Sequence, residues 1–76
     1  MTKLKSKRVE AGMSQSQLAE KAGLNVRTLQ HYEQASKPFD HARIDTILKV
    51  CIALSCKIED VLENQDYIDL MKKLPQ

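Results

Sequence analysis

The chain has 76 residues, a formal net charge of +2 and 42% hydrophobic residues, which limits it to one domain with a small core. A core of this size argues against an enzyme with a large enclosed cavity. No apolar stretch reaches the roughly 20 residues of a membrane-spanning helix, and no signal-peptide hydrophobic region lies near the N-terminus, so we expect a cytoplasmic protein. The two cysteines, Cys51 and Cys56, form neither a zinc-binding pattern nor a disulfide framework. We therefore expect no metal and no cofactor.

The charges are divided unevenly along the chain. Residues 1–37 hold seven basic and three acidic side chains, whereas residues 38–76 hold five basic and seven acidic ones. A basic half joined to an acidic half is typical of a domain that turns one face toward a polyanion. An ordinary solvated surface can produce the same asymmetry, so the charge pattern alone leaves both interpretations open.

Two short helices are predicted at the start of the chain. The first runs over about residues 2–11 and ends at Gly12, because glycine readily adopts the left-handed conformation that closes many helices. The second begins at Ser14, whose hydroxyl can cap free backbone amides, and Gln17 completes a capping-box pattern three residues later. The residue types themselves therefore place these two boundaries.

A tight turn is predicted between the second helix and the third. Gly23 tolerates the positive φ of such a turn, and Asn25 is a favourable N-cap. The third helix covers about residues 26–34. Three of its side chains are expected to face the core: Val26, Leu29 and Tyr32.

Further helices are predicted in the second half of the chain. Asp40 is a suitable N-cap for a fourth helix, which carries the clearest apolar stripe at helical spacing: Ile44, Ile47, Leu48, Cys51 and Leu54. A fifth short helix is expected to direct three side chains inward: Ile58, Val61 and Leu62. The tail repeats apolar residues at intervals of three and four, which makes it a candidate for a sixth helix: Tyr67, Leu70, Met71 and Leu74. The prediction is an all-α fold, a compact bundle of five short helices in residues 1–64, followed by a C-terminal tail, residues 65–76.

Three parts of the sequence occur in a characteristic order and spacing. They are the pattern SQxxLAxxAGLN over the second helix and the turn, the pair Tyr32-Glu33 at the end of the third helix, and ILKVCIAL followed by IEDVL. Over roughly residues 4–63 the chain resembles the helix-turn-helix family of phage repressors, Cro proteins and related bacterial (XRE-type) regulators. Agreement over about 60 residues is more specific than any short motif. The resemblance implies a lambda-repressor-like DNA-binding domain.

The resemblance implies that the third helix lies in the major groove with its N-terminal residues on base edges. The expected base-reading residues are Val26, Arg27, Gln30 and His31. Arg27 can form two hydrogen bonds with guanine, His31 can donate or accept one, and Val26 can contact a thymine methyl. Arg27 is thus the expected main source of specificity, with a solvated surface charge or a phosphate contact as the alternative.

Other residues are expected to hold the domain on the DNA. Gln15 falls where the family places a side chain and an amide against a phosphate, and the further phosphate candidates are Asn25, Thr28 and Lys37. Arg8 and Glu33 match a family pair that would brace the reading helix against the first helix. Ala35 and Ser55 depart from the pattern, because the family usually has glycine at both positions.

The function expected from the resemblance is sequence-specific binding of double-stranded DNA by a transcription regulator, with repression as the mode of action. Family members bind pseudo-palindromic operators as dimers, so a homodimer is expected. The tail stripe or exposed parts of the fourth and fifth helices are candidate dimer surfaces, although the tail can instead pack on its own core or fray. No catalytic motif is present, and an enzyme is not expected. The competing interpretation is a protein-interaction module that keeps this fold without binding DNA.

Overall fold

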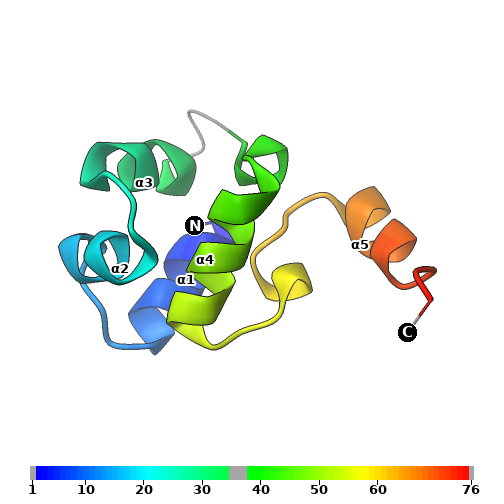
Figure 1. Ribbon diagram of the computed structural model, residues 1–76, viewed down its shortest axis with the longest axis horizontal. Coiled ribbons are helices and arrows are strands. Elements are labelled where there is room, and N and C mark those ends of the chain that lie inside the picture. The colour runs from blue at the N-terminus through cyan, green and yellow to red at the C-terminus, as the bar shows by residue number, and fades with distance from the viewer. Residues whose placement is uncertain (1, 35–37, 76) are drawn as a thin grey trace.

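The computed structural model describes residues 2–34 and 38–75, and these form short helices joined by turns (Figure 1). The elements in chain order are α1 (Lys3–Glu10), α2 (Gln15–Ala22), α3 (Val26–Glu33), the 3₁₀ turn η1 (Phe39–His41), α4 (Ile44–Leu54), the 3₁₀ turn η2 (Ile58–Asp60) and α5 (Gln65–Met71). No strand occurs among these residues. The predicted all-α fold is confirmed.

The ends of the first helices lie where the capping residues predicted them. The Gln17 amide donates to Ser14 Oγ at 3.1 Å, and the Ser14 amide donates to Gln17 Oε1 at 2.7 Å, which is the expected capping box. Gly12 and Gly23 have φ angles of 72° and 71°, as a left-handed helix end requires. Local residue types are thus sufficient to end α1 and to begin and end α2.

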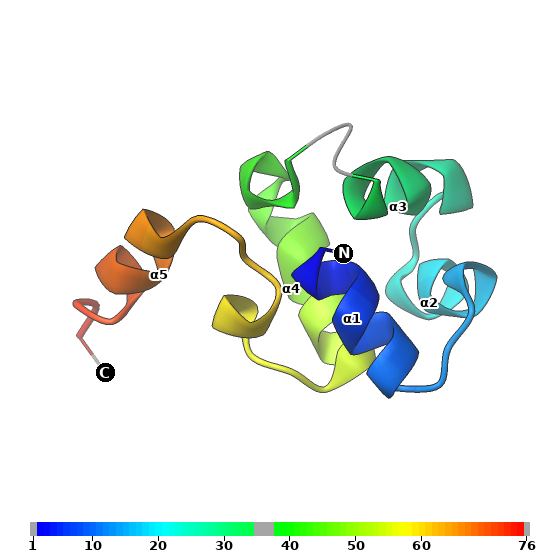
Figure 2. The same ribbon diagram turned by 180° about the vertical axis from the view of Figure 1, so that it is seen from behind.

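The core forms around α4, which crosses the middle of the molecule and packs against α2 (Figures 1 and 2). Side chains from most elements meet there, and the largest fully buried ones are Leu4, Leu18, Leu29, Val50 and Val61. Apolar burial of this kind stabilises a fold by about 25 cal/mol per Å². Because each short helix has little stability alone, this shared core is what holds the helices in place.

Two expectations for α4 are wrong. Asp40 does not cap it, because the chain first turns through η1 and α4 begins only after Arg43. The side chains of Ile44 and Leu48 are 65% and 43% exposed, while Val50 is fully buried. Apolar residues lie around most of α4, so periodicity alone cannot select the side that packs against its neighbours.

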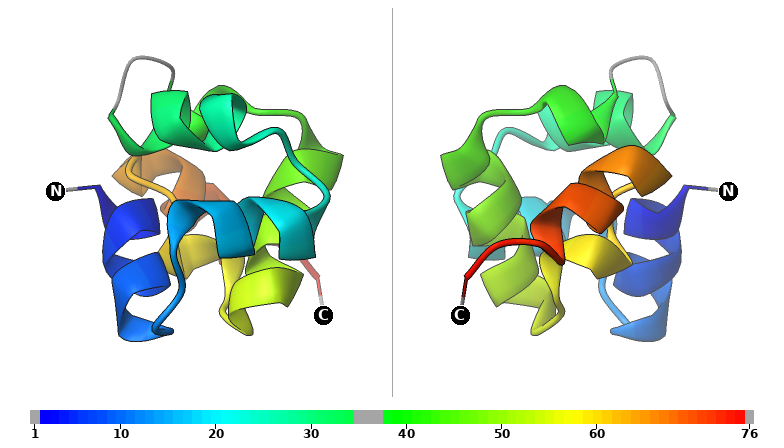
Figure 3. Two further views of the ribbon diagram at one scale, coloured as in Figure 1. Left: turned by 90° about the vertical axis from the view of Figure 1, so that its left-hand side faces the viewer. Right: turned by 90° about the vertical axis from the view of Figure 1, so that its right-hand side faces the viewer.

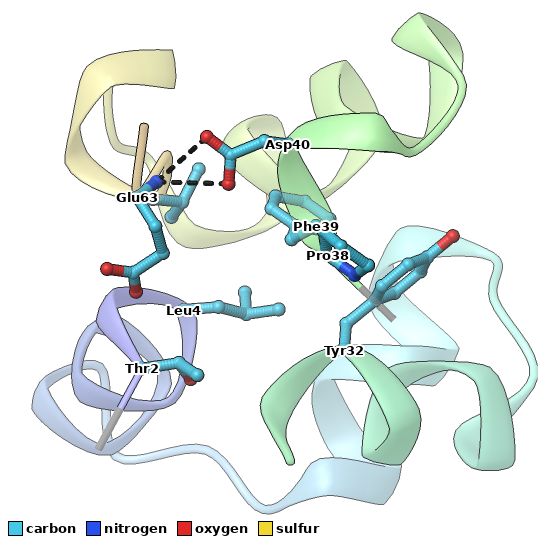
Figure 4. A pocket seen from close by; sticks show the side chains of 8 residues that line it. Thr2, Leu4, Tyr32, Pro38, Phe39, Asp40 and Glu63 are labelled. Carbon is cyan, nitrogen blue, oxygen red and sulfur yellow. Dashed lines mark hydrogen bonds between the residues drawn. The ribbon is translucent and has the colours of Figure 1, made fainter. Parts of the chain in front are cut away.

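Asp40 instead joins two distant segments. Its carboxylate accepts hydrogen bonds from the backbone amide of Glu63, at 3.0 and 3.1 Å (Figure 4). It also accepts from the backbone amide of Asn64 at 2.7 Å. The Glu63 carboxylate in turn accepts from the Lys3 amide at 2.6 Å. These bonds border a largely apolar cavity of about 200 Å³ between α1, the end of α3, η1 and the segment after η2. They tie η1, α1 and the start of the tail into one scaffold.

Of the last two predicted helices, the fifth needs correction, whereas the sixth is present. The fifth is only the 3₁₀ turn η2, although Val61 and Leu62 beside it are buried as expected. The tail does form a helix, α5, but its buried residue is Ile68. Tyr67 and Met71 pack partly against the core, whereas two members of the predicted stripe are largely exposed: Leu70 and Leu74.

Candidate nucleic-acid interface

The candidate interface is formed by α2, the turn at Gly23 and α3. The Leu24 amide donates to the Ala19 carbonyl at 2.7 Å, and the Gly23 amide donates to the Glu20 carbonyl at 3.2 Å, which closes α2. Asn25 Oδ1 then accepts from the Arg27 amide at 2.8 Å and caps α3, as predicted. The sequence around Gly23 thus sets a short, well-bonded corner between two helices.

The first turn of α3 presents two predicted base-reading residues to solvent. Val26 is 38% exposed, so the expectation that it faces the core is wrong. Arg27 is also exposed, and within the part of the chain that the structure describes its guanidinium has no carboxylate partner. His31 is half-buried one turn further along the helix, at the i+4 position that lies on the same face as Arg27. Arg27 and His31 therefore share one face of α3, and Val26 is exposed next to Arg27 in the first turn.

The fourth predicted base-reading residue, Gln30, has an intramolecular partner. Its Nε2 donates to Gln15 Oε1 at 3.3 Å, and Gln15 Nε2 donates to Glu33 Oε1 at 3.1 Å. Both glutamine side chains are half-buried. The structure thereby connects a predicted base-reading residue with a predicted phosphate-contacting residue. No local pattern in the sequence indicates this connection, because it spans α2 and α3.

Arg8 and Glu33 meet in a buried ion pair between α1 and α3. Arg8 Nε lies 2.7 Å from Glu33 Oε2, and Arg8 Nη2 donates to Glu33 Oε1 at 3.1 Å. Arg8 Nη1 also donates to the Met13 carbonyl at 2.8 Å. Only 11% of the arginine side chain and 1% of the glutamate side chain are exposed. A two-point pair of this kind fixes both distance and orientation, so it holds the end of α3 against the N-terminal half of the domain.

The predicted phosphate-contacting residues lie at different depths. Gln15 is the first residue of α2, Asn25 is exposed beside the turn, and Thr28 is half-buried on α3. Lys37 lies outside the described residues, as does Ala35. Gln15 and Asn25 both stand at helix N-termini, where the helix dipole and free amides favour anions.

Neither a membrane-spanning element nor a metal cluster is found in the part of the chain that can be described. No helix there has both the length and the apolar character needed to cross a membrane. Residues 2–34 and 38–75 also contain no group of three or more His, Cys, Asp or Glu side chains arranged to hold a metal ion.

Comparison with known proteins agrees with this geometry. No curated protein matches the chain. A family model for the Cro/C1-type helix-turn-helix (HTH) DNA-binding domain matches residues 3–66, a range that includes α2, the turn and α3. The chain therefore belongs to the family of Cro/C1-type HTH DNA-binding domains, whose members bind DNA and regulate transcription.

Proposed function

We propose that this protein represses transcription by placing α3 in the major groove of a specific DNA sequence. The observation that carries this proposal is the position of Arg27. Its side chain is exposed in the first turn of α3, beside Val26 and one turn before His31. The first turn of a reading helix is the part that reaches base edges.

Each exposed side chain on α3 has a distinct task in this proposal. Arg27 pairs with guanine O6 and N7, His31 forms one hydrogen bond with a base, and Val26 contacts a thymine methyl. Gln30 reads a base only with the part of its amide that Gln15 leaves free, since Gln30 Nε2 already donates to Gln15. Arg27 consequently carries most of the sequence discrimination.

Contacts to the DNA phosphates set the register of the domain on the duplex. Gln15, Asn25, Thr28 and Lys37 contact phosphates, which position a protein without reading sequence. The Arg8–Glu33 pair holds α3 in a fixed position on the domain, and so in a fixed orientation in the groove. One eight-residue helix makes few base contacts, so we also propose a homodimer on a pseudo-palindromic operator, with two half-sites about one DNA turn apart.

The test is selection of bound sequences from a random duplex library at near-physiological salt, performed with the parent and with Arg27→Ala. The matched control is Lys73→Ala, because Lys73 is exposed and follows α5, outside α2 and α3. We expect a palindromic consensus for the parent and the control, and loss of a preferred guanine in Arg27→Ala. Affinity for the consensus should fall roughly 5- to 150-fold for each half-site, because each copy of Arg27 supplies one two-point base contact. No enrichment with the parent would refute DNA reading and favour a protein-interaction module.

A further inference from the structure

An apolar stripe on α4 faces away from the core. Its members are Ile44, Leu48 and Ile52, spaced four residues apart, with side chains that are 65%, 43% and 76% exposed. Residues at this spacing follow one another along one side of a helix. The opposite side of α4 packs against α2 and η2. The stripe is therefore a continuous apolar ridge that the rest of the described chain leaves largely uncovered.

We propose that this ridge pairs with the same ridge of a second copy of the chain, the two α4 helices running antiparallel about a twofold axis. A twofold interface brings one patch against itself. Antiparallel pairing centred on Leu48 places Leu48 against Leu48 of the second copy, and Ile44 against Ile52 of the second copy. The equal spacing on both sides of Leu48 makes the ridge self-complementary in this arrangement.

The charges beside the ridge are complementary in the same arrangement. Asp45 and Lys49 each follow a member of the ridge by one position, so both lie on the same flank of α4. Lys49 is exposed, and the Asp45 side chain is 48% exposed and pairs with Arg43 Nε of its own chain at 3.2 Å. Under the twofold axis that relates antiparallel helices, this flank meets the same flank of the second copy, and Asp45 lies near Lys49 of that copy. Each dimer therefore gains two pairs of opposite charge at the edge of its apolar contact.

The position of α3 is compatible with this pairing. Figure 1 shows α2 and α3 on one side of α4 and α5 on the other, and Figure 3 shows α4 along the side of the molecule with α3 across the top. A twofold axis running across α4, from the α3 side to the α5 side, keeps both copies of α3 on the same side of the dimer. Two half-sites on one duplex require this arrangement.

This inference rests on the proposed function only for the role of the dimer, so its test measures self-association in the absence of DNA. Sedimentation equilibrium compares the parent with Ile52→Lys and with the control Leu74→Lys. Ile52 is the most exposed member of the ridge, and Leu74, in the tail, is 64% exposed, so neither change disturbs the core. We expect Ile52→Lys to raise the dimer dissociation constant roughly tenfold or more, because a lysine in the contact loses its hydration. Leu74→Lys should associate like the parent.

A charge-exchange experiment tests the antiparallel geometry itself. Lys49→Glu sets two acidic side chains against each other, and Asp45→Lys sets two basic ones against each other. Each variant alone should associate several-fold more weakly than the parent, whereas a 1:1 mixture should associate more tightly than either variant. This recovery is expected because both contacts in the mixed dimer again join opposite charges.

Three results would overturn the inference: a parent that stays monomeric across the accessible concentration range, a Leu74→Lys variant as impaired as Ile52→Lys, or a mixture no tighter than its components. The second result would assign the dimer surface to the tail. A monomeric parent that still selects a DNA consensus would leave the proposed function intact, whereas a dimer without DNA selection would refute the function and leave the interface.

Discussion

Removal of the Glu33 side chain tests whether the buried ion pair holds α3 in place. Glu33→Ala leaves the Arg8 guanidinium without its carboxylate partner and also removes the acceptor of Gln15 Nε2. Among the described residues, Arg8 then keeps its bond to the Met13 carbonyl. Because 11% of the arginine side chain is exposed, water can compensate only part of the loss.

The expected cost is large for a domain of this size. Breaking a buried pair by removing one partner costs about 3–5 kcal/mol, and the residual exposure of Arg8 favours the lower value. A 76-residue domain has an unfolding free energy of about 4–11 kcal/mol at typical values per residue. A loss of about 3 kcal/mol lowers Tm by roughly 12–24 °C at this chain length.

Thermal unfolding followed by circular dichroism measures this shift. The matched control is Glu10→Ala, which removes a surface pair with Lys7 at 3.5 Å and should cost less than about 1 kcal/mol. A double variant, Arg8→Met with Glu33→Leu, should recover part of the loss, because well-packed apolar residues can replace a buried ion pair. DNA binding by Glu33→Ala, measured at a temperature where the variant is folded, should also be weaker than for the parent.

The reasoning fails if Glu33→Ala and Glu10→Ala melt within a few degrees of each other. It also fails if Glu33→Ala, once folded, binds the selected DNA like the parent. The first result would show that the pair contributes no more than a surface contact, and the second that α3 keeps its position without it.

Three further predictions concern a helix cap, a residue in the left-handed conformation and a buried thiol. Ser14→Ala removes the capping box of α2 and should cost about 1 kcal/mol in chemical unfolding, whereas Ser16→Ala, at an exposed position inside the same helix, should cost less than half of that. Ser55 has a φ of 52°, a left-handed conformation that costs an L-residue about 1–2 kcal/mol, so Ser55→Gly should raise Tm, and a lower Tm would contradict this account. Burial and then the neighbouring Cys56 thiol raise the pKa of Cys51 from 9.0 to about 12. The unfolded chain thus ionises first as the pH rises above 9, and the unfolding free energy should fall there; an equal slope for Cys51→Ala between pH 9 and 11 would rule out this cause.

Local residue types set the ends of α1 and α2 and the start of α3. Ser14 with Gln17, Gly23 and Asn25 act on backbone groups within three or four positions, so their effect does not depend on distant parts of the chain. The shared face of Arg27 and His31 could be predicted for the same reason, because the two residues lie four positions apart in any helix that starts after Asn25. The Arg8–Glu33 pair was anticipated only through the resemblance to a family, since its two residues lie far apart in the sequence.

Which faces of the helices are buried depends on contacts between segments that lie far apart in the sequence. In α4 the apolar residues occupy most of the circumference, and contact with α2 selects Ile47 and Val50 for the core while Ile44 and Ile52 stay outside. Asp40 looks like a helix cap in the sequence, but it bonds to amides more than twenty residues away. Burial and long-range hydrogen bonds depend on which segments meet, whereas capping depends on neighbours along the chain. The ends of α1 and α2 and the start of α3 could therefore be predicted from the sequence, whereas the start of α4 and the sides on which the helices meet could not.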